Sequence, residues 1–518
     1  MKNLLCSFTF FFMVSFNLIA QEVPVQNPFQ EPGTVTRGVF GTDDRKEATD
    51  AKNFQDYVRA TAVMVPKSSF VDNRIYGNTL RQRLTRIFGT ANFDPNVKFL
   101  DQPAIAQCTG FLIAPDILVT AGHCILDMTT ANDYYWVFDY TNDLPYNAKE
   151  KYVTVKRENI FSVTSILAAE LDDYNYLNNT DYSVLRLNKK STRRPYRFRT
   201  SGTVSKGTRV FTVGTPTGLP LKLSENSKVI DIEPANWFMS DTDVFPGNSG
   251  GPIFDPSGWL EGILVRTAAQ ELSDGELTAD YKYNPDCDCI QTVEFNEVYS
   301  TAGSQAHKIN KIPDWILRQS IAENLYYAIE NNLETRFKDW EVYNWIFTDV
   351  QTVEKRRFED VAISFQRYEM LSKILSYTAK TYTDKSTREV MDFAYWRKDL
   401  KAFEMIMNQG VHVDAGTDKP TTFLQDMVMA GEIMWVKKLL EYQPNVQIRD
   451  ASGNNLLHLA ALSGNMEMLQ LLTSLKINAG AKNKKKQLPE KIANIGKHKD
   501  AANYLMNVRK GKIKVSKL

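Results

Sequence analysis

The sequence predicts an all-β region that ends near residue 305, followed by an all-α region of helical repeats. Between residues 39 and 299, short apolar runs alternate with turn residues such as Ala114-Pro115-Asp116, which favours a sandwich or barrel over a βαβ sheet. After about residue 306 the apolar residues follow helical spacing, and Gly464 follows Gly431 at an interval of 33 residues, a period typical of stacked repeats. The length of 518 residues also indicates about two to four domains.

The first 38 residues have the composition of export signals. Lys2 precedes an apolar run from Leu4 to Ile19, and the small residue Ala20 follows, so residues 1–20 are predicted to be a secretory signal peptide. An uncleaved anchor is the alternative, although the run is shorter than the roughly 20 residues of a spanning helix. Residues 21–38 are rich in Pro, Gln and Glu and indicate a leader or propeptide. We therefore expect a secreted or periplasmic protein without stable membrane insertion after signal removal.

The net charge bears on the expected partners, and the cysteine content bears on disulfides and metal binding. The 62 basic and 61 acidic residues give a net charge of +1, which offers no support for a nucleic-acid partner. Signal removal would leave Cys108, Cys124, Cys287 and Cys289, which allow three disulfide pairings. Zinc is less favoured because the spacing lacks two paired knuckles. No metal and no cofactor is expected.

The predicted strands of the all-β region are short. They cover residues 60–65, 110–113, 117–120, 152–155, 182–187, 209–213 and 262–265. A histidine, His123, lies just after the run that ends at residue 120, and an aspartate, Asp181, directly precedes the run that begins at residue 182.

Three residues of this region form a candidate catalytic set. Ser249 lies in Gly247-Asn248-Ser249-Gly250-Gly251-Pro252, where small neighbours expose it, and a serine needs an adjacent base. His123 is the only histidine before residue 300. Asp181 would orient it from a strand end, with Asp172 and Asp173 as rivals. The G-x-S-x-G elbow of α/β-hydrolases is disfavoured because Pro252 and an apolar β-like pair follow.

Five motifs in this order resemble the chymotrypsin-fold serine proteases, and in particular the bacterial branch similar to glutamyl endopeptidases. They are Gly41-Thr42-Asp43-Asp44-Arg45, Cys108-Thr109-Gly110-Phe111-Leu112-Ile113, Thr120-Ala121-Gly122-His123-Cys124, Thr180-Asp181-Tyr182-Ser183 and Gly247-Asn248-Ser249-Gly250-Gly251-Pro252. The resemblance implies a double β-barrel serine protease domain over residues 39–305.

The resemblance also assigns roles to individual residues. Ser249 would attack the scissile carbonyl, His123 would act as base and then acid, and Asp181 would orient His123. The N–H groups of Gly247 and Ser249 would form the oxyanion hole. A Cys108–Cys124 disulfide is implied, which leaves Cys287 and Cys289 to close a C-x-C ring or to stay reduced. The alternative is an inactive, protease-like binding module.

Substrate preference is left open by the sequence. The candidate substrate-binding residues are Asp243, Val244, Leu264, Arg266 and Thr267. Leu264 stands where glutamyl endopeptidases carry a histidine, and Asp243 stands six residues before Ser249, where trypsin-like enzymes carry a carboxylate for Arg or Lys. Asp243 could instead brace its own loop, and Arg266 would favour acidic residues at a secondary subsite.

The helical region resembles ankyrin repeats. The stretch from Gly453 to Asn465, which includes Asn455-Leu456-Leu457-His458-Leu459-Ala460, matches the ankyrin signature, and the 33-residue step also reaches Lys398, Lys497 and Asn332. The expected organisation is a helical linker with degenerate repeats over 306–389, ankyrin repeats over 390–510 and a basic tail over 511–518. His458 would be the hydrogen-bonding histidine of the motif.

An ankyrin array usually binds a protein on its concave face. Three roles follow for this chain: the array recruits substrates, holds the protein to a partner, or covers the active site. The Lys484-Lys485-Lys486 run and the basic tail are interpreted as solvated surface, with a polyanion contact as the alternative. The expected partners are polypeptide substrates and a protein on the ankyrin face.

Overall fold

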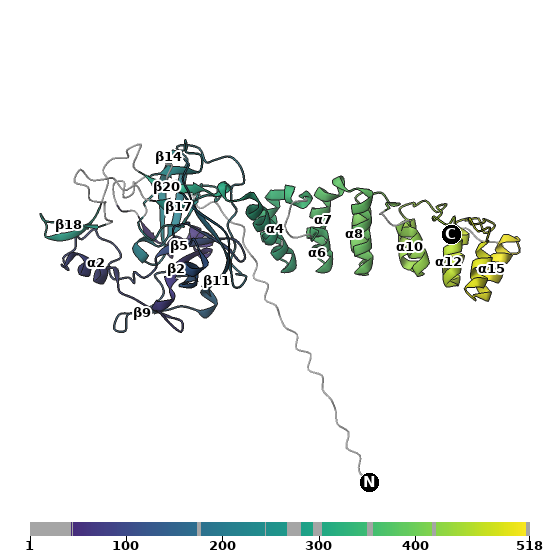
Figure 1. Cartoon of the computed structure of the whole chain (residues 1–518), viewed down its shortest axis with the longest axis horizontal. Helices are drawn as coiled ribbons and strands as arrows, with labels where there is room; N and C mark the ends of the chain where they lie inside the picture. Colours follow the sequence, from purple (N-terminus) through teal and green to yellow (C-terminus); the bar gives the residue numbers. More distant parts are fainter. Residues whose placement is uncertain are drawn as a thin grey trace, which may run out of the picture.

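The computed structural model describes residues 43, 45–172, 178–243, 245–266, 281–293, 303–349, 356–416 and 421–513. A β-rich body formed by the first part of the chain continues into a row of helices that extends from one side of it (Figure 1). Within these described ranges, no helix is both long and apolar enough to cross a membrane.

The first large sheet is an open, curled half-barrel of antiparallel strands. Its strand order is β10-β7-β2-β5-β6-β12-β11. In that order the strands are Ile160–Phe161, Tyr134–Phe138, Thr61–Pro66, Cys108–Ala114, Ile117–Thr120, Thr180–Leu187 and Val163–Asp172. The central strands are buried on both faces, because every residue of β5 and β6 is inaccessible to solvent or nearly so.

The second large sheet closes on itself. Its order is β1-β14-β13-β16-β17-β20-β15, and β15 pairs again with β14. In that order the strands are Lys46–Glu47, Lys222–Asp231, Arg209–Gly214, Pro252–Phe254, Leu260–Arg266, Ser304–Lys308 and Trp237–Ser240. Six strands therefore form a barrel with β1 at its edge, which confirms the double β-barrel. Strand β20 extends past residue 305, where the sequence places the end of this region.

Smaller elements surround the two barrels. A hairpin pairs β18 with β19, and a separate sheet has the order β3-β4-β9-β8. These elements, with the short helices of this part, are Tyr281–Asn284, Cys289–Thr292, Phe70–Val71, Arg74–Tyr76, Tyr152–Thr154, Tyr146–Asn147, α1 Gln55–Arg59, α2 Leu80–Phe88 and α3 Met128–Asn132. The run predicted over 152–155 therefore forms β9 of the small sheet and not a barrel strand.

The helical region consists of consecutive helix pairs. They are α4 Asp314–Glu330 with α5 Glu334–Trp340, α6 Phe358–Ser364 with α7 Tyr368–Thr378, α8 Asp384–Trp396 with α9 Leu400–Met407, α10 Phe423–Ala430 with α11 Ile433–Leu440, α12 Leu456–Ser463 with α13 Met466–Ser474, and α14 Pro489–Ile495 with α15 Lys499–Arg509. Helix pairs thus also occupy residues 314–378, where the sequence predicts degenerate repeats.

The 33-residue period is visible in the backbone between the two helices of each pair. One residue there has a positive φ in every pair: Asn332 58°, Gln366 55°, Lys398 55°, Gly431 73°, Gly464 68° and Lys497 64°. A left-handed residue ends one helix and lets the chain reverse into the next. Gln366 is one position out of step: it lies 34 residues after Asn332 and 32 residues before Lys398, and the later positions follow the period of 33.

His458 links two neighbouring repeats. Its side chain is buried at 1% exposure, and its Nε2 lies 3.0 Å from the carbonyl oxygen of Gln487 in the next repeat. Its backbone N–H donates to Oδ1 of Asn455, the N-cap of α12. These contacts agree with the structural role predicted for this histidine.

The first helix pair is fused to the first barrel. Asn324 on α4 donates from Nδ2 to the carbonyl oxygen of Ile113 at 2.7 Å. Arg186 on β12 makes two hydrogen bonds, of 3.1 and 3.0 Å, to the carboxylate of Glu323. Just after α5, the hydroxyl of Tyr343 donates at 2.6 Å to the carbonyl oxygen of Phe198, which lies in the segment between β12 and β13. A single apolar core runs from β2 and β5 through α4 into the repeats, so the two regions form one continuous body.

We expect a chain that ends at residue 311 to unfold at a much lower temperature than the full chain, or without cooperativity. Such a chain lacks α4, whose Ile316, Leu317, Ile321 and Leu325 are fully buried or nearly so. Burial of each contributes about 1.5–3 kcal/mol, and their sum is comparable to the roughly 5–15 kcal/mol that stabilises a whole domain. A chain that ends after residue 382 keeps the first two helix pairs and should retain cooperative thermal unfolding; equal behaviour of the two truncations would contradict the fusion.

We expect substitutions at two of the left-handed positions to change the stability of the array in opposite directions. Gly464→Ala should destabilise the array by at least about 1 kcal/mol, because a Cβ there would also lie 2.4 Å from the ring of His498. Lys497→Gly should stabilise it by about 0.5–1 kcal/mol, since glycine adopts a positive φ without steric cost. Urea denaturation followed by circular dichroism measures both, and two shifts of the same sign would exclude this explanation.

Candidate active site

The loop that carries Ser249 is shaped by two glycines that have no room for a side chain. Gly247 has a φ of 103° and Gly250 a φ of 83°, values that favour glycine. A Cβ on Gly247 would lie 2.3 Å from the carbonyl oxygen of Thr215, and one on Gly250 would lie 2.1 Å from that of Thr109. The loop therefore packs directly against the neighbouring backbone, and Ser249 lies at its turn.

Thr109 on β5 holds this loop from the first barrel. Its hydroxyl donates to the carbonyl oxygen of Gly247 at 2.8 Å and accepts from the N–H of Thr215 at 3.1 Å. Its own N–H donates to the carbonyl oxygen of Ser249 at 2.8 Å. Thr109 is fully buried. The sequence did not single out this residue, and its place directly after Cys108 is the only local signal of its role.

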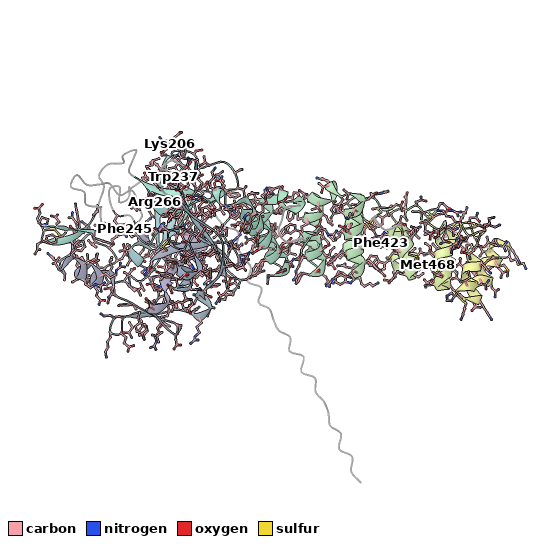
Figure 2. The ribbon with its side chains drawn as sticks, in the orientation of Figure 1. Lys206, Trp237, Phe245, Arg266, Phe423 and Met468 are labelled. Atoms are coloured by element: carbon pink, nitrogen blue, oxygen red, sulfur yellow. A yellow bond between two sulfur atoms is a disulfide. The ribbon has the colours of Figure 1, made fainter. Side chains whose placement is uncertain are left out.

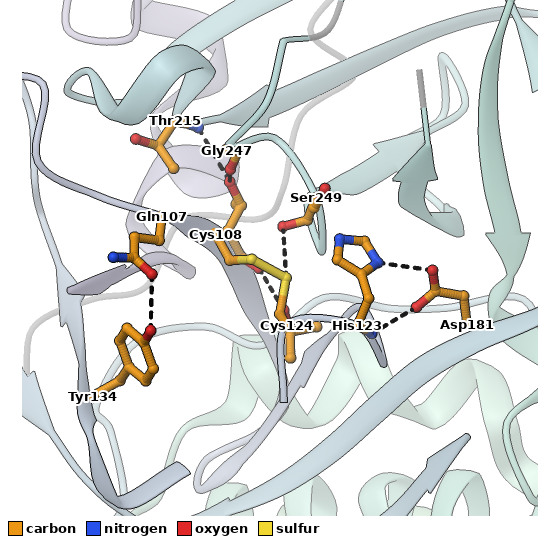
Figure 3. Close-up of a disulfide and its surroundings, with 11 residues drawn as sticks. Gln107, Cys108, His123, Cys124, Tyr134, Asp181, Thr215, Gly247 and Ser249 are labelled. Atoms are coloured by element: carbon orange, nitrogen blue, oxygen red, sulfur yellow. Dashed lines mark hydrogen bonds and ion pairs between the residues drawn. A yellow bond between two sulfur atoms is a disulfide. The ribbon is translucent and has the colours of Figure 1, made fainter. Parts of the chain in front are cut away.

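A disulfide joins Cys108 to Cys124, the pairing that the resemblance implied. Cys108 precedes Thr109 and Cys124 follows His123, so the bond ties β5 to the histidine loop (Figure 3). Both sulfurs lie near His123, but in a disulfide they are not thiolates that could bind a metal with it. A second disulfide joins Cys287 to Cys289, so the C-x-C ring is closed in this structure.

His123 and Asp181 form a two-point contact. Nδ1 of His123 lies 2.8 Å from Oδ2 of Asp181, and the backbone N–H of His123 donates to Oδ1 at 3.0 Å. Asp181 is buried, with 2% exposure. Because it contacts both the ring and the backbone of His123, it fixes the ring in one orientation. The imidazole lies between Asp181 and Ser249 in Figure 3. Of the two rivals, Asp172 is solvent-exposed on β11, and Asp173 lies outside the described residues.

The backbone of the serine loop leaves two amide groups available. The N–H of Asn248 donates to Phe245 and that of Gly250 donates to Leu264. Within the part of the chain that the structure describes, the N–H groups of Gly247 and Ser249 donate to no protein acceptor. Two such donors beside a serine are what a developing oxyanion requires.

A pocket of about 290 Å³ opens beside Ser249. Its lining combines polar and apolar groups and consists of Phe245, Pro246, Asn248, Ser249, Leu264, Val265 and Arg266. Two predicted substrate-binding residues, Leu264 and Arg266, thus border it. Asp243 is 3% exposed and does not line this pocket, and Val244 and Thr267 lie outside the described residues. Phe245 and Arg266 lie in the part of the β-rich body away from the helices (Figure 2).

A second histidine lies near Asp181. Strand β20 carries His307, which is 1% exposed and packs on the ring of Tyr182 at 5.2 Å between centroids. Burial lowers the pKa of His307 to about 4, although the carboxylate of Asp181 raises it in part. This side chain is therefore uncharged at neutral pH and enclosed in the barrel, whereas His123 is accessible to a substrate. The sequence did not include His307 among the candidate site residues.

Comparisons with known proteins find one family in the β-rich part of the chain and another in the helical part. Residues 108–263 match a family model described as a trypsin-like peptidase domain. Residues 390–487 match a family model described as ankyrin repeats in three copies. No curated protein matches the chain significantly.

We expect Thr109→Val to destabilise the protein by about 1–3 kcal/mol, because the buried carbonyl of Gly247 and N–H of Thr215 would lose their partner. Valine has nearly the same shape, so packing changes little. Thr109→Ser keeps the hydroxyl and serves as the matched control. Chemical denaturation of the three proteins measures the effect. A Val variant as stable as the Ser variant would show that the hydroxyl does not hold the loop.

Proposed function

We propose that this chain, which contains a trypsin-like peptidase domain followed by C-terminal ankyrin repeats, is an exported serine endopeptidase whose repeats bind proteins. The observation that carries the proposal is the arrangement of Asp181, His123 and Ser249 beside an open pocket. The hydrogen bonds of Asp181 to both the ring and the backbone of His123 support an imidazole held as a general base.

The proposed reaction proceeds through an acyl-enzyme. Ser249 Oγ attacks the scissile carbonyl while His123 accepts its proton, and His123 then donates that proton to the leaving amine. Asp181 keeps the Nδ1 proton in place and stabilises the imidazolium. The N–H groups of Gly247 and Ser249 donate to the oxyanion. Water then attacks the acyl-enzyme with His123 as base, which releases the acid product and restores Ser249.

Export is supported by the cysteine chemistry of the described residues. All four cysteines that remain after the predicted signal are paired in disulfides, and such bonds persist in oxidising compartments. The predicted signal peptide and the leader over 21–38 lie outside the described residues. We propose a secreted or periplasmic location on these grounds.

The ankyrin array is proposed to bind protein partners and not to cover the active site of its own chain. The pocket residues Phe245 and Arg266 lie away from the array in Figure 2, and the array is fused to the body through a continuous core. Four large apolar side chains recur at the 33-residue period near the ends of α8, α10, α12 and α14. They are Trp396, Met429, Leu462 and Ile495, with exposures of 68%, 39%, 57% and 56%.

An inactive, protease-like binding module with the same scaffold is the second candidate. It shares the fold and the array, so only reactivity separates it from the protease. The tight fit of the serine loop and the two available amides favour the enzyme, because a surface used only for binding needs neither.

Ser249→Ala should reduce hydrolysis of an unfolded reporter protein to background, because it removes the nucleophile. Asp181→Asn should lower kcat by roughly 10⁴-fold, since the amide would select the wrong tautomer of His123. Ser257→Ala, at an exposed turn, is the matched control and should retain full activity. Cleavage is followed on gels, and the products are identified by mass spectrometry.

Labelling with a fluorophosphonate reports on Ser249 without any substrate preference. Turnover by Ser249→Ala at the wild-type rate would refute the mechanism. A wild-type chain that neither cleaves nor becomes labelled would favour the binding module.

A further inference from the structure

The segment that enters the second barrel contains a buried arginine with no part in the proposed reaction. Arg45 precedes β1 and is only 2% exposed. Its Nε and Nη2 donate to the two carboxylate oxygens of Asp43 at 2.8 and 2.6 Å. A buried guanidinium is costly unless it is paired, and the two-point contact with Asp43 fixes the orientation of this one.

The flat face of this guanidinium lies on the wall of the pocket. Its central carbon is 3.7 Å from the centroid of the Phe245 ring and 5.6 Å from that of Phe99. Phe245 lines the pocket beside Ser249, and its carbonyl oxygen accepts the N–H of Asn248. The same ring therefore contacts Arg45 and borders the space open to substrate.

Neighbouring groups fix the segment that follows Arg45 and the ring of Phe245. Strand β1 pairs with β14, and the buried Lys222 of β14 donates to Glu47 at 2.8 Å. Tyr281 packs near Phe245, with 6.1 Å between ring centroids. The ring of Phe245 is thus held between the hairpin of β18 and the entering segment.

We propose that Arg45 is a positioning residue that fixes the Phe245 wall of the substrate pocket. This inference rests on the proposed function and deepens it: Arg45 determines how well the substrate side chain next to the cleaved bond is bound. It gives the motif Gly41-Thr42-Asp43-Asp44-Arg45 a role, because Asp43 pairs with the charge while the guanidinium plane supports the ring. A lysine can replace it only in part, since it keeps the charge but lacks both the fork and the plane.

The first test is a double-substitution cycle in steady-state kinetics of the full chain on one peptide substrate. Arg45→Met should raise KM about tenfold with kcat changed less than about twofold, because Ser249 chemistry is untouched. Arg45→Lys should recover part of the loss. Phe245→Leu should raise KM similarly, and adding Arg45→Met to it should have little further effect. Arg74→Met is the matched control, because Arg74 stacks on Tyr152 at 4.7 Å in the small sheet, and it should leave KM unchanged.

Three results would overturn the proposal: an unchanged KM in Arg45→Met, effects of the two substitutions that multiply, or an equal loss of kcat and of fluorophosphonate labelling. The same four proteins can also be compared by thermal unfolding, a measurement that does not require enzymatic activity. There, Arg45→Met and Phe245→Leu should lower Tm less together than the sum of their separate effects. An inactive, unlabelled wild-type chain would refute the proposed function alone, and additive Tm shifts would refute the contact alone.

Discussion

The candidate site depends on two adjacent residues of one strand, Cys108 and Thr109 of β5. Cys108 is bonded to Cys124, the residue after His123, and Thr109 is hydrogen-bonded to the backbone of the loop that carries Ser249. The candidate base, His123, and the candidate nucleophile, Ser249, are thereby both attached to the same short piece of backbone. Because both anchors are buried, neither loop can shift without breaking a covalent bond or exposing an unpaired polar group.

The first helix of the array, α4, also contacts the strands that carry the candidate site residues. Asn324 of α4 binds the carbonyl of Ile113 near the far end of β5, and Glu323 pairs with Arg186 on β12, the strand that begins beside Asp181. The strand with Thr109 and the strand with Asp181 are therefore both fastened to α4. Helix α4 pairs with α5 as a repeat helix does, but it packs against the strands of the protease-like body. For this reason a boundary near residue 305 does not separate two independent units.

The parts of this structure that follow from local sequence were predictable. Short apolar runs located the central strands. The 33-residue step reached Asn332, Lys398, Gly431, Gly464 and Lys497, and the structure shows that these are left-handed residues between paired helices. Contacts that depend on barrel closure were not predictable from the sequence. Thr109 contacts a loop 138 residues away. His307 lies near Asp181 because of the position of β20 in the second barrel, and Arg45 contacts Phe245 although the two are far apart in the sequence. No spacing in the chain signals such pairs, since sheet closure alone brings them together.

The continuity of the core limits how the array could influence catalysis. A flexible tether would let the repeats fold back over the pocket, but the buried contacts of α4 with β5 and β12 fix the direction in which they leave the body. A partner held on the exposed stripe of Trp396, Met429, Leu462 and Ile495 would then act mainly by raising the local concentration of protein near the active site. Such an effect would lower the apparent KM for proteins that bind the array and would leave the cleavage of short peptides unchanged. A partner that altered the site itself would instead change the cleavage of short peptides as well.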